Sequence, residues 1–414
     1  MNQDRSGPLA GLKVLDLSRI LAGPWAGQLL ADFGADVVKV ERPGVGDDTR
    51  GWGPPFLRDP SGAETTNNAA YYMSANRGKR SITLDFAAPE GQAVVKRLVE
   101  CADVLIENYK VGGLAKYGLD YAALKEVNPR LIYCSITGFG QSGPYAHRTG
   151  YDLIAQAMGG IMSITGERDD LPGGGPQKVG VAAADLMTGM YAATAILAAH
   201  ASRERTGRGQ HIDLALLDTQ VAWLANQAMN YLIGGEAPER AGNEHQNIVP
   251  YGVFPTRDGY FALAIGNNSQ LRKFCDVAGH PEIPDDPRFA TNIGRLQNRV
   301  ELIATLNDIT RQRTMDEWSA VLEPVGVPCG PINTLDRVFA NPHVQARGMK
   351  VSIPHSLGVE VDYPANPVKF SETPVDYPRA APMLGEDADA VLRDWLDLDD
   401  AAVAALRESD IGLD

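Results

Sequence analysis

The first half of the chain alternates short apolar runs with segments of helical spacing. The apolar runs lie at residues 12–17, 36–41, 103–108 and 130–137, and helical patterns fill the intervals between them. Such alternation is typical of a parallel sheet with helices on both faces, because each strand is then buried on both sides. The pattern therefore predicts an α/β, Rossmann-like large domain. Ligands of such sheets bind beyond the carboxyl ends of the strands. Those ends precede the loops that follow Leu17, Glu41, Asn108 and Thr137.

The chain of 414 residues is long enough for more than one domain. Glycine and charge increase through the segment EAPERAGNEHQ, which indicates a linker, and strand patterns with amphipathic helices follow it. A stretch with many prolines then leads to helical patterns near the carboxyl end. These patterns predict a large domain over 1–205 that 386–414 completes, a linker over 206–249, a smaller α+β domain over 250–335 and a return linker over 336–385.

Acidic residues outnumber basic ones, 52 Asp and Glu against 38 Lys and Arg, which gives a net charge of −14. Such a surface repels polyphosphates, so nucleic acid is not expected as a partner and any anion needs a local basic pocket. The first residues lack the apolar core of a signal peptide, and no apolar stretch is long enough for a membrane helix. We therefore expect a cytoplasmic protein with no membrane partner.

Four cysteines lie far apart in the sequence, with no CxxC pair and no clustered histidines beside them. They are Cys101, Cys134, Cys275 and Cys329. This spacing predicts reduced thiols, no bound metal and no disulfide framework.

The turn at Gly23 and Pro24 follows the first strand and opens a helix, as the phosphate loop of a dinucleotide fold does. Glu41 ends the second strand, where such folds place the acid that binds ribose. The glycine fingerprint is absent, however, and Pro24 removes one N–H group that would bind pyrophosphate. An ordinary α/β turn is the favoured interpretation, and dinucleotide binding is the alternative.

Several cations stand at strand ends and in the adjacent loops. They are Arg19, Arg42, the segment Asn76-Arg77-Gly78-Lys79-Arg80, and Lys116 behind Asn108 and Tyr109. On the ligand edge of a sheet such groups can bind a phosphorylated ligand, with arginine as a bidentate donor and lysine as a point charge. The alternative is an exposed, solvated face, which is the usual role of a run of charges.

Asp185 is the only acidic residue between Asp170 and Glu204. It follows a run of small apolar residues and stands where a long helix should begin. One interpretation is a helix N-cap, since Asp is favoured there. The other is a nucleophile, because a carboxylate beside apolar walls is partly desolvated and therefore reactive.

Several segments, in order, resemble the class III coenzyme A transferases, the family that includes formyl-CoA transferase, carnitine CoA-transferase and α-methylacyl-CoA racemase. The matching segments are GLKVLDLSRILAGPWAGQLLADFGADVVKVERPGVGDDTR, NRGKRSITLD, ADVLIENY, GYDLIAQAMGGIMSITG, AADLMTGMYAATAIL, TGRGQHIDLALLD and VPCGPIN, and they cover essentially the whole chain. The segments GDDTRGWGPPF, YCSITGFGQSGP, NYLIGG, NIVPYGVF and GNN resemble the branch that moves CoA from succinyl-CoA to dicarboxylic acids such as glutarate.

The resemblance implies a fold, a nucleophile and a CoA site. The family fold is an interlaced homodimer of open-ring subunits, each with a large and a small domain. The family nucleophile is an aspartate, which the motif places at Asp185, and it carries CoA as a thioester. CoA enters as a thioester substrate, and no cofactor is bound permanently. The residues that the resemblance assigns to CoA are Arg19, Leu21, Ala22, Arg42, Asn76, Lys79, Arg80, Asn108, Tyr109 and Lys116.

The chain departs from its relatives in ways that narrow the substrate. Formyl-CoA transferase has histidine and glutamine where this chain has Arg19 and Leu21, and its glycine lid is replaced here by ERAGNEHQNIVP. We therefore expect an acyl group larger than formyl or oxalyl. The family racemases use a histidine where this chain has Tyr151, and tyrosine, with a pKa near 10, is a poor base. A 2-methylacyl-CoA racemase and a CoA-binding protein without turnover remain the alternatives.

The second carboxylate of a dicarboxylic acid needs a cation or donors, because an unpaired anion in a dry site is unfavourable. The substrate-side loops offer five such groups: His147, Arg148, Arg240, Asn243 and His245. We expect Arg148 and His245 to receive it, beside Tyr151, since one precedes the GYD segment and the other occupies the family's lid position. The alternative is that these are exposed loop residues.

Overall fold

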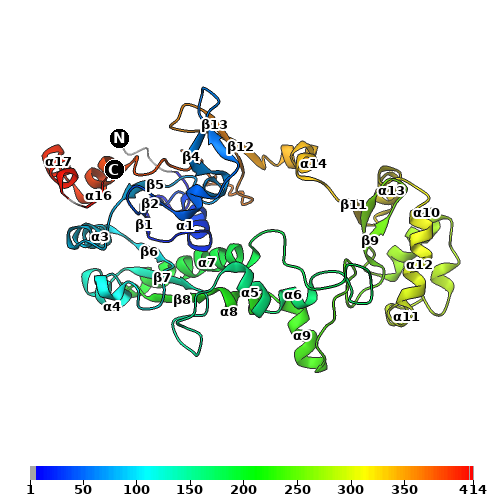
Figure 1. Ribbon diagram of the computed structural model, residues 1–414. Coiled ribbons are helices and arrows are strands. Elements are labelled where there is room, and N and C mark those ends of the chain that lie inside the picture. Colours follow the sequence, from blue (N-terminus) through cyan, green and yellow to red (C-terminus); the bar gives the residue numbers. More distant parts are fainter. Residues whose placement is uncertain (1–5, 410, 414) are drawn as a thin grey trace. The chain divides into compact units, whose positions relative to one another are not determined.

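The computed structural model describes residues 6–409 and 411–413 and divides into two compact units (Figure 1). The first unit comprises Met1–Gly160, Val179–Ala228 and His343–Asp414, and the second comprises Ile161–Lys178 and Met229–Pro342. All six strands of the parallel sheet lie in the first unit.

The sheet of the first unit has six strands, all parallel, in the order β5-β2-β1-β6-β7-β8. Their bounds are β1 Lys13–Asp16, β2 Asp36–Glu41, β5 Arg80–Thr83, β6 Val104–Glu107, β7 Ile132–Thr137 and β8 His211–Ala215. The mixed α/β fold with a parallel sheet is confirmed. The strand order reverses between β1 and β6, and ligands of open α/β sheets bind at such a switch point.

Successive strand residues point to opposite faces, so each strand contributes to two cores. On one face Leu15, Leu105 and Tyr133 pack under α3 (Pro89–Cys101), α4 (Tyr121–Val127) and α16 (Ala388–Leu396). On the other face Val14 and Ile106 pack against α1 (Ala22–Asp32) and α7 (Ala183–Thr206). Burial on both faces explains why the strands are continuous apolar runs in the sequence.

The second unit holds a three-stranded antiparallel sheet, β11-β10-β9, with helices packed on it. Its elements include β9 Tyr251–Pro255, β10 Tyr260–Ala264, β11 Cys329–Pro331, α10 Asn268–Ala278, α12 Arg299–Thr310 and α13 Met315–Leu322. The buried ring of Trp318 stacks on Phe274 and Phe261, with centroids 5.6 and 6.2 Å away. A capping box of Thr314 and Glu317 starts α13.

The stretches expected as linkers contain secondary structure of their own. Residues 206–249 include α8 (Leu216–Ala222) and α9 (Ala225–Gly234), and residues 336–385 include the hairpin of β12 (Lys350–Pro354) and β13 (Glu360–Pro364). The hairpin buries Ile353 and Tyr363 against Tyr72 and Met73. This proline-containing stretch therefore packs on the first unit as a hairpin, because it buries an apolar residue from each of its strands.

The remaining elements are short. They are η1 Asp48–Gly51, β3 Phe56–Arg58, β4 Glu64–Ala69, α2 Ala70–Met73, η2 Ala115–Tyr117, α5 Asp152–Met158, α6 Ile161–Ile164, η3 Ile283–Asp285, α11 Asn292–Gln297, η4 Glu323–Val325, α14 Leu335–Ala340, α15 Pro342–Ala346 and α17 Asp400–Glu408.

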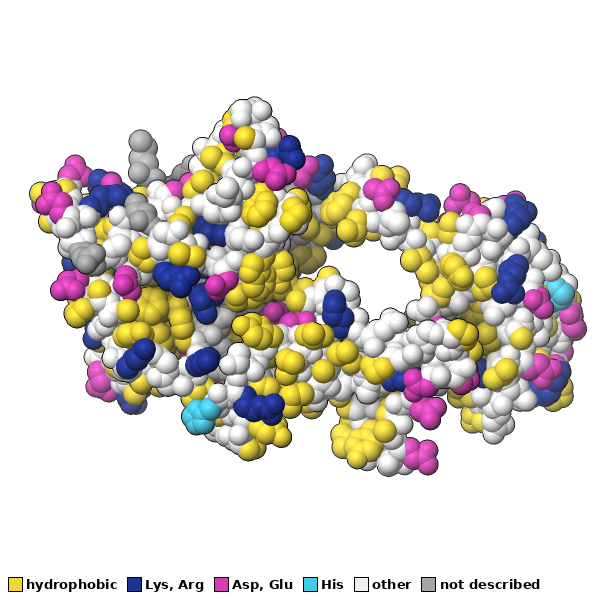
Figure 2. All heavy atoms as spheres, in the orientation of Figure 1, with side chains coloured by type: hydrophobic (Ala, Val, Ile, Leu, Met, Phe, Trp, Pro, Cys, Tyr) yellow, Lys and Arg dark blue, Asp and Glu magenta, His cyan; other side chains and the backbone are white. Residues whose placement is uncertain are grey.

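Apolar side chains also lie on the surface, and Figure 2 shows such side chains gathered over α9. No helix in the described part of the chain is long and apolar enough to cross a membrane. Within residues 6–409 and 411–413 no group of three or more His, Cys, Asp or Glu side chains is placed to hold a metal ion. The four cysteines are free thiols, and Cys134 and Cys275 are buried.

Candidate active site

Asp185 lies in the first turn of α7, but it does not cap that helix. The N-cap position is Ala182, and the carboxylate that accepts the free amides comes from Asp152 at the start of α5. The N–H groups of Ala184 and Asp185 donate to Asp152 Oδ1 at 2.8 and 3.3 Å. The interpretation of Asp185 as an N-cap is therefore wrong, because another carboxylate already fills that role.

Asp152 is itself fixed by the buried side chain of Gln156, one turn later on α5. The amide of Gln156 donates to Asp152 Oδ2 at 2.7 Å, and its oxygen accepts from the N–H of Val179 at 2.9 Å. These bonds connect α5 to the segment that leads into α7. The position of the Asp185 backbone is thus set by two polar side chains rather than by apolar packing alone.

The carboxylate of Asp185 is buried and unpaired. Only 9% of the residue is exposed, and the described part of the chain offers its carboxylate no recorded hydrogen bond or ion pair. Burial raises the pKa of Asp185 to about 7, and the nearby charge of Asp152 adds to that rise. Burial raises the pKa of the nearby Tyr71 phenol, and the charge of Asp185 raises it further. The ionised form of Asp185 is therefore unfavourable in free energy, and a covalent bond to its carboxylate would remove the buried charge.

At the switch point the loops after β1 and β6 are joined by a single side chain. Asn108 accepts from the N–H of Arg19 at 2.8 Å and donates to the carbonyl of Arg19 at 2.6 Å. The guanidinium of Arg19 lies 5.6 Å from the ring centre of Tyr109. Leu21 and Ala22 follow and are buried at the start of α1.

A cavity of about 240 Å³ opens beside these loops. Its lining includes Arg19, Arg42 and Tyr109, three of the residues predicted to contact CoA. Arg42 is exposed, and no ion pair is recorded for its guanidinium among the described residues. Arg19 pairs with Asp48 at 2.9 Å, both partly exposed, and the lining also includes the acids Glu41, Asp47 and Asp85. Arg42 is therefore the cation of this cavity with no recorded ion pair among the described residues, and beside the Tyr109 ring it suits a phosphorylated, partly aromatic ligand. Lys116 is exposed in η2, over the ring of Tyr117 at 4.5 Å, and does not line this cavity.

Asn76, Lys79 and Arg80 have internal partners instead of facing the cavity. Lys79 is fully buried, and its ammonium donates to Asp16, the Pro24 carbonyl and Asn76 at 2.8 to 2.9 Å. Burial lowers the pKa of Lys79 to about 8 despite the Asp16 carboxylate.

The amide of Asn76 donates to the Tyr72 carbonyl at 2.9 Å, and Arg80 pairs with Asp36 and with Asp394. We therefore correct the expectation that these three residues bind CoA phosphates, since their donors are already used within the fold.

The carboxylate of Glu41 also has partners within the fold. Its carboxylate accepts two bonds from the buried guanidinium of Arg50, at 2.7 and 2.8 Å, and one from Ser81 at 2.7 Å. It is buried and offers nothing to a ribose. The dinucleotide interpretation therefore loses its acid, and the ordinary turn after β1 is kept.

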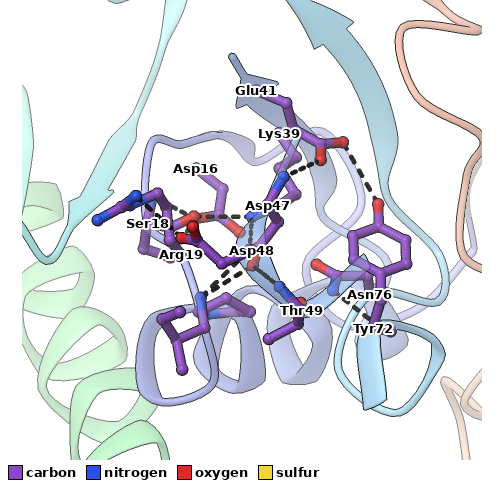
Figure 3. Close-up of polar contacts among 12 residues, drawn as sticks. Asp16, Ser18, Arg19, Lys39, Glu41, Asp47, Asp48, Thr49, Tyr72 and Asn76 are labelled. Atoms are coloured by element: carbon purple, nitrogen blue, oxygen red, sulfur yellow. Dashed lines mark hydrogen bonds and ion pairs between the residues drawn. The ribbon is translucent and has the colours of Figure 1, made fainter. Parts of the chain in front are cut away.

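A buried charge cluster that was not predicted from the sequence includes Lys39 and Asp47, which also line the cavity. Figure 3 shows contacts within this cluster. Lys39 pairs with Asp47 at 2.9 Å and donates to the Ser18 carbonyl at 2.7 Å, while Asp16 pairs with Lys79. The available signal was Asp16, an acid inside a buried strand, which requires a cationic partner. Asp47 gave no such signal, because it stands in a polar loop segment.

The two residues expected to receive the second carboxylate, Arg148 and His245, lie in different units. Arg148 and Tyr151 are exposed in the first unit, with the Arg148 guanidinium 4.6 Å from the ring centre of Tyr145. His245 belongs to the second unit, where its Nδ1 accepts from the N–H of Asn247 at 3.0 Å. Arg240 is paired there with Asp169 and so is not a free cation.

Comparison with known proteins adds to this geometry. The model of CoA-transferase family III matches residues 9–388. The succinate–glutarate CoA-transferase of Agrobacterium fabrum is 53% identical over 94% of this chain and 96% of that protein. The human succinyl-CoA:glutarate CoA-transferase is 43% identical over 96% of this chain and 88% of that protein.

The crystal structure of a CAIB/BAIF family protein from Brucella suis is 52% identical, with a TM-score of 0.83, over 94% of this chain and all of that chain. The family match spans most of the chain, and the relatives are similar over nearly its whole length. The chain belongs to CoA-transferase family III.

Proposed function

We propose that this protein transfers CoA from succinyl-CoA to glutarate through a thioester on Asp185. The observation that carries the proposal is the buried, unpaired carboxylate of Asp185, with its pKa near 7, at the position that the family motif assigns to the nucleophile. The choice of substrates is supported by relatives that match nearly the whole chain and are named for this pair.

The reaction requires only acyl transfers. An Asp185 oxygen attacks the thioester carbonyl, the C–S bond breaks, and CoA leaves as a thiolate from a succinyl-aspartyl anhydride. The thiolate then attacks the aspartyl carbonyl, which releases succinate and forms the aspartyl-CoA thioester. Glutarate attacks this thioester, and the expelled thiolate attacks the glutaryl carbonyl to give glutaryl-CoA and free Asp185. No net proton or electron is exchanged.

Burial of Asp185 serves this sequence in two ways. A desolvated carboxylate is a better nucleophile than a hydrated one, and each covalent state removes a charge that the site disfavours. Anhydrides and thioesters also hydrolyse, so a site with little exposed area protects them from water. The same burial that raises the pKa of Asp185 therefore favours both attack and survival of the intermediates.

We assign CoA binding to the switch-point loops and their cavity. Arg42 supplies charge for the phosphates, Arg19 adds to it by exchanging its exposed partner Asp48 for a phosphate, and Tyr109 supplies an aromatic wall. Leu21 and Ala22 supply the adjacent backbone. Arg42→Ala should raise the KM for succinyl-CoA about 10- to 100-fold, since one charge-assisted contact is lost. The KM for glutarate should stay unchanged, and an equal rise in both would contradict this assignment.

For the second carboxylate of glutarate we propose Arg148, an exposed cation of the first unit. Arg148→Ala should impair glutarate strongly and a monocarboxylate such as butyrate hardly at all. Equal losses with both acids would show that Arg148 is structural. Arg337→Ala, which changes an exposed arginine of α14, is the matched control and should affect neither acid.

We further propose that two copies of the chain assemble, as the family resemblance implies. Exposed apolar side chains support this proposal, because isolated monomers rarely expose many of them together. Over α9 they are Met229, Tyr231, Leu232 and Ile233, of which Ile233 is 80% exposed. Beside the site they are Leu153, Ile154, Met158, Met190 and Tyr191. Light scattering of the purified protein should give twice the 44.5 kDa chain mass.

A direct assay tests the function. The protein is incubated with succinyl-CoA and, separately, glutarate, itaconate, malate, 3-hydroxy-3-methylglutarate and oxalate, and the acyl-CoA products are identified by mass spectrometry. We expect glutaryl-CoA to form fastest. Epimerisation of a 2-methylacyl-CoA without transfer would favour the racemase, and CoA binding without any product would favour a non-catalytic role.

A further inference from the structure

The backbone of Ile20, in the loop after β1, has an unusual conformation. Its φ is +72°, in the left-handed region that a β-branched residue rarely adopts. Only three non-glycine residues among those described have a positive φ. A strained residue of this kind persists only where its surroundings fix it, and such residues cluster at ligand sites.

Two side chains from other loops, Asp47 and Asn108, hold this stretch of backbone, and Figure 3 shows Asp47. Both carboxylate oxygens of Asp47 accept from the N–H of Ile20, each at 3.2 Å. The side chain of Asn108 binds both the backbone N–H and the backbone carbonyl of the preceding residue, Arg19. The loop therefore has its polar backbone groups satisfied in this conformation rather than in a relaxed one.

Asp47 is in turn held in a fixed position. It is 2% exposed and pairs with the buried Lys39. It also accepts from the N–H and the hydroxyl of Thr49 at 3.0 and 2.8 Å, and its own N–H donates to Glu41 at 2.9 Å. Burial opposes ionisation, but Lys39 and Thr49 keep the pKa of Asp47 below its usual value. The carboxylate thus stays charged and in place.

The same residue lines the cavity. Asp47 forms part of its wall together with Arg19, Arg42 and Tyr109, and Ile20 connects Arg19 to the start of α1. The conformation of Ile20 therefore decides the direction of the chain between Arg19 and the first amides of α1. A relaxed Ile20 would move both.

We propose that Asp47 is a positioning residue that holds Ile20 in the left-handed conformation and thereby shapes the loop after β1 for CoA. This inference rests on the proposed function, since CoA is taken as the ligand of the cavity. Asp47 acts here through the backbone of Ile20 and not by contact with the reacting atoms.

The test is a double-mutant cycle read by calorimetric binding of free CoA. Asp47→Ala should weaken CoA binding about tenfold or more, because Ile20 then relaxes. Ile20→Gly in the same chain should recover most of this loss, since glycine adopts a φ of +72° without strain. Ile20→Gly alone should change the affinity by less than about threefold. If Asp47→Ala fails to fold, Asp47→Asn is measured instead: its amide oxygen still accepts from the Ile20 N–H, so CoA affinity should stay within about threefold of the wild type, and a tenfold loss would overturn the inference.

Asp59→Ala is the matched control, because Asp59 also accepts backbone amides in a loop, at 2.8 and 3.1 Å, but lies away from the cavity. It should leave CoA affinity unchanged. Unaltered binding in Asp47→Ala would overturn the inference, as would a loss that glycine at position 20 does not recover. Failure of the wild-type protein to bind CoA would instead overturn the proposed function.

Discussion

Asp185 and Asp47 are both buried aspartates of the first unit, but their carboxylates have opposite surroundings. Asp47 has a lysine and two donor groups of Thr49 around its carboxylate, so its pKa stays below the usual value despite burial. Asp185 has no such donors recorded in the described part of the chain, so burial, and after it the charge of Asp152, raises its pKa to about 7. Burial alone therefore does not decide what a carboxylate does. The partners around it decide whether it stabilises a loop or stays reactive.

The charge cluster at the cavity and the start of α7 differ in the same way. The cluster of Asp16, Lys39, Asp47 and Lys79 pairs each of its buried charges, and two of its members, Lys39 and Asp47, line the cavity. The start of α7 satisfies its amides through Asp152 and leaves the Asp185 carboxylate unpaired. Four variants break or sharpen this contrast, and they follow in order of expected effect.

Asp185→Ala should have the largest effect on activity, a loss of about 10⁴-fold or more, as for other removed nucleophiles. The fold should persist, because Asp152 caps α7 and the lost carboxylate has no recorded partner among the described residues. Steady-state transfer from succinyl-CoA to glutarate measures the loss, with circular dichroism as the folding control. Turnover within about tenfold of the wild type would contradict the nucleophilic role.

Lys39→Met should destabilise the protein by about 3–5 kcal/mol, because Asp16 and Asp47 would lose a buried cation. Urea unfolding at neutral pH measures this difference. Adding Asp47→Asn to the same chain should restore part of the stability by removing one unpaired charge. A change below about 1 kcal/mol would show that the cluster is not needed for the fold.

Asp185→Asn should stabilise the fold at neutral and higher pH, by roughly 2–4 kcal/mol. A pKa that is raised on folding gives the wild type relative stability below the unfolded value of 3.8, and that stability is lost as pH rises through about 7. The variant's advantage should therefore grow from near zero at about pH 4 to its maximum above about pH 7. Urea unfolding across this range tests the sign, and an advantage that does not vary with pH would contradict it.

Asp152→Asn should have the smallest effect, a shift of the acid limb of kcat/KM to lower pH by about one unit. The wild-type limb should lie near pH 7, because attack requires the Asp185 anion. The amide removes the negative neighbour but keeps an oxygen for the Ala184 N–H. A pH–rate profile measures the shift, and a limb that stays in place or moves upward would refute the role of Asp152.

The parallel sheet and the position of the nucleophile could be predicted from the sequence. Strands such as 36–41 are buried on both faces, so their apolar runs are visible without any knowledge of their neighbours. Asp185 stood out because it is the only acid in a long apolar segment. Its partner, by contrast, comes from another helix, so the sequence could not show that Asp152 and not Asp185 caps α7.

The fate of the cations depends on contacts that local sequence does not contain. Lys79 and Arg42 are both basic residues near strand ends, but Lys79 turns inward to Asp16 and Arg42 stays exposed at the cavity. The left-handed Ile20 could not be foreseen either, because it is imposed by Asp47 against the preference of the residue itself. Tertiary pairing outweighs local preference at these positions.

Trapping the covalent intermediate tests the central claim most directly. The protein is incubated with succinyl-CoA without an acceptor acid, treated with hydroxylamine, digested and analysed by mass spectrometry. We predict a hydroxamate on Asp185 alone, formed from its CoA thioester, and none in Asp185→Ala. Glutaryl-CoA production by the wild type, with Asp185 unmodified or with the adduct on another residue, would contradict the account.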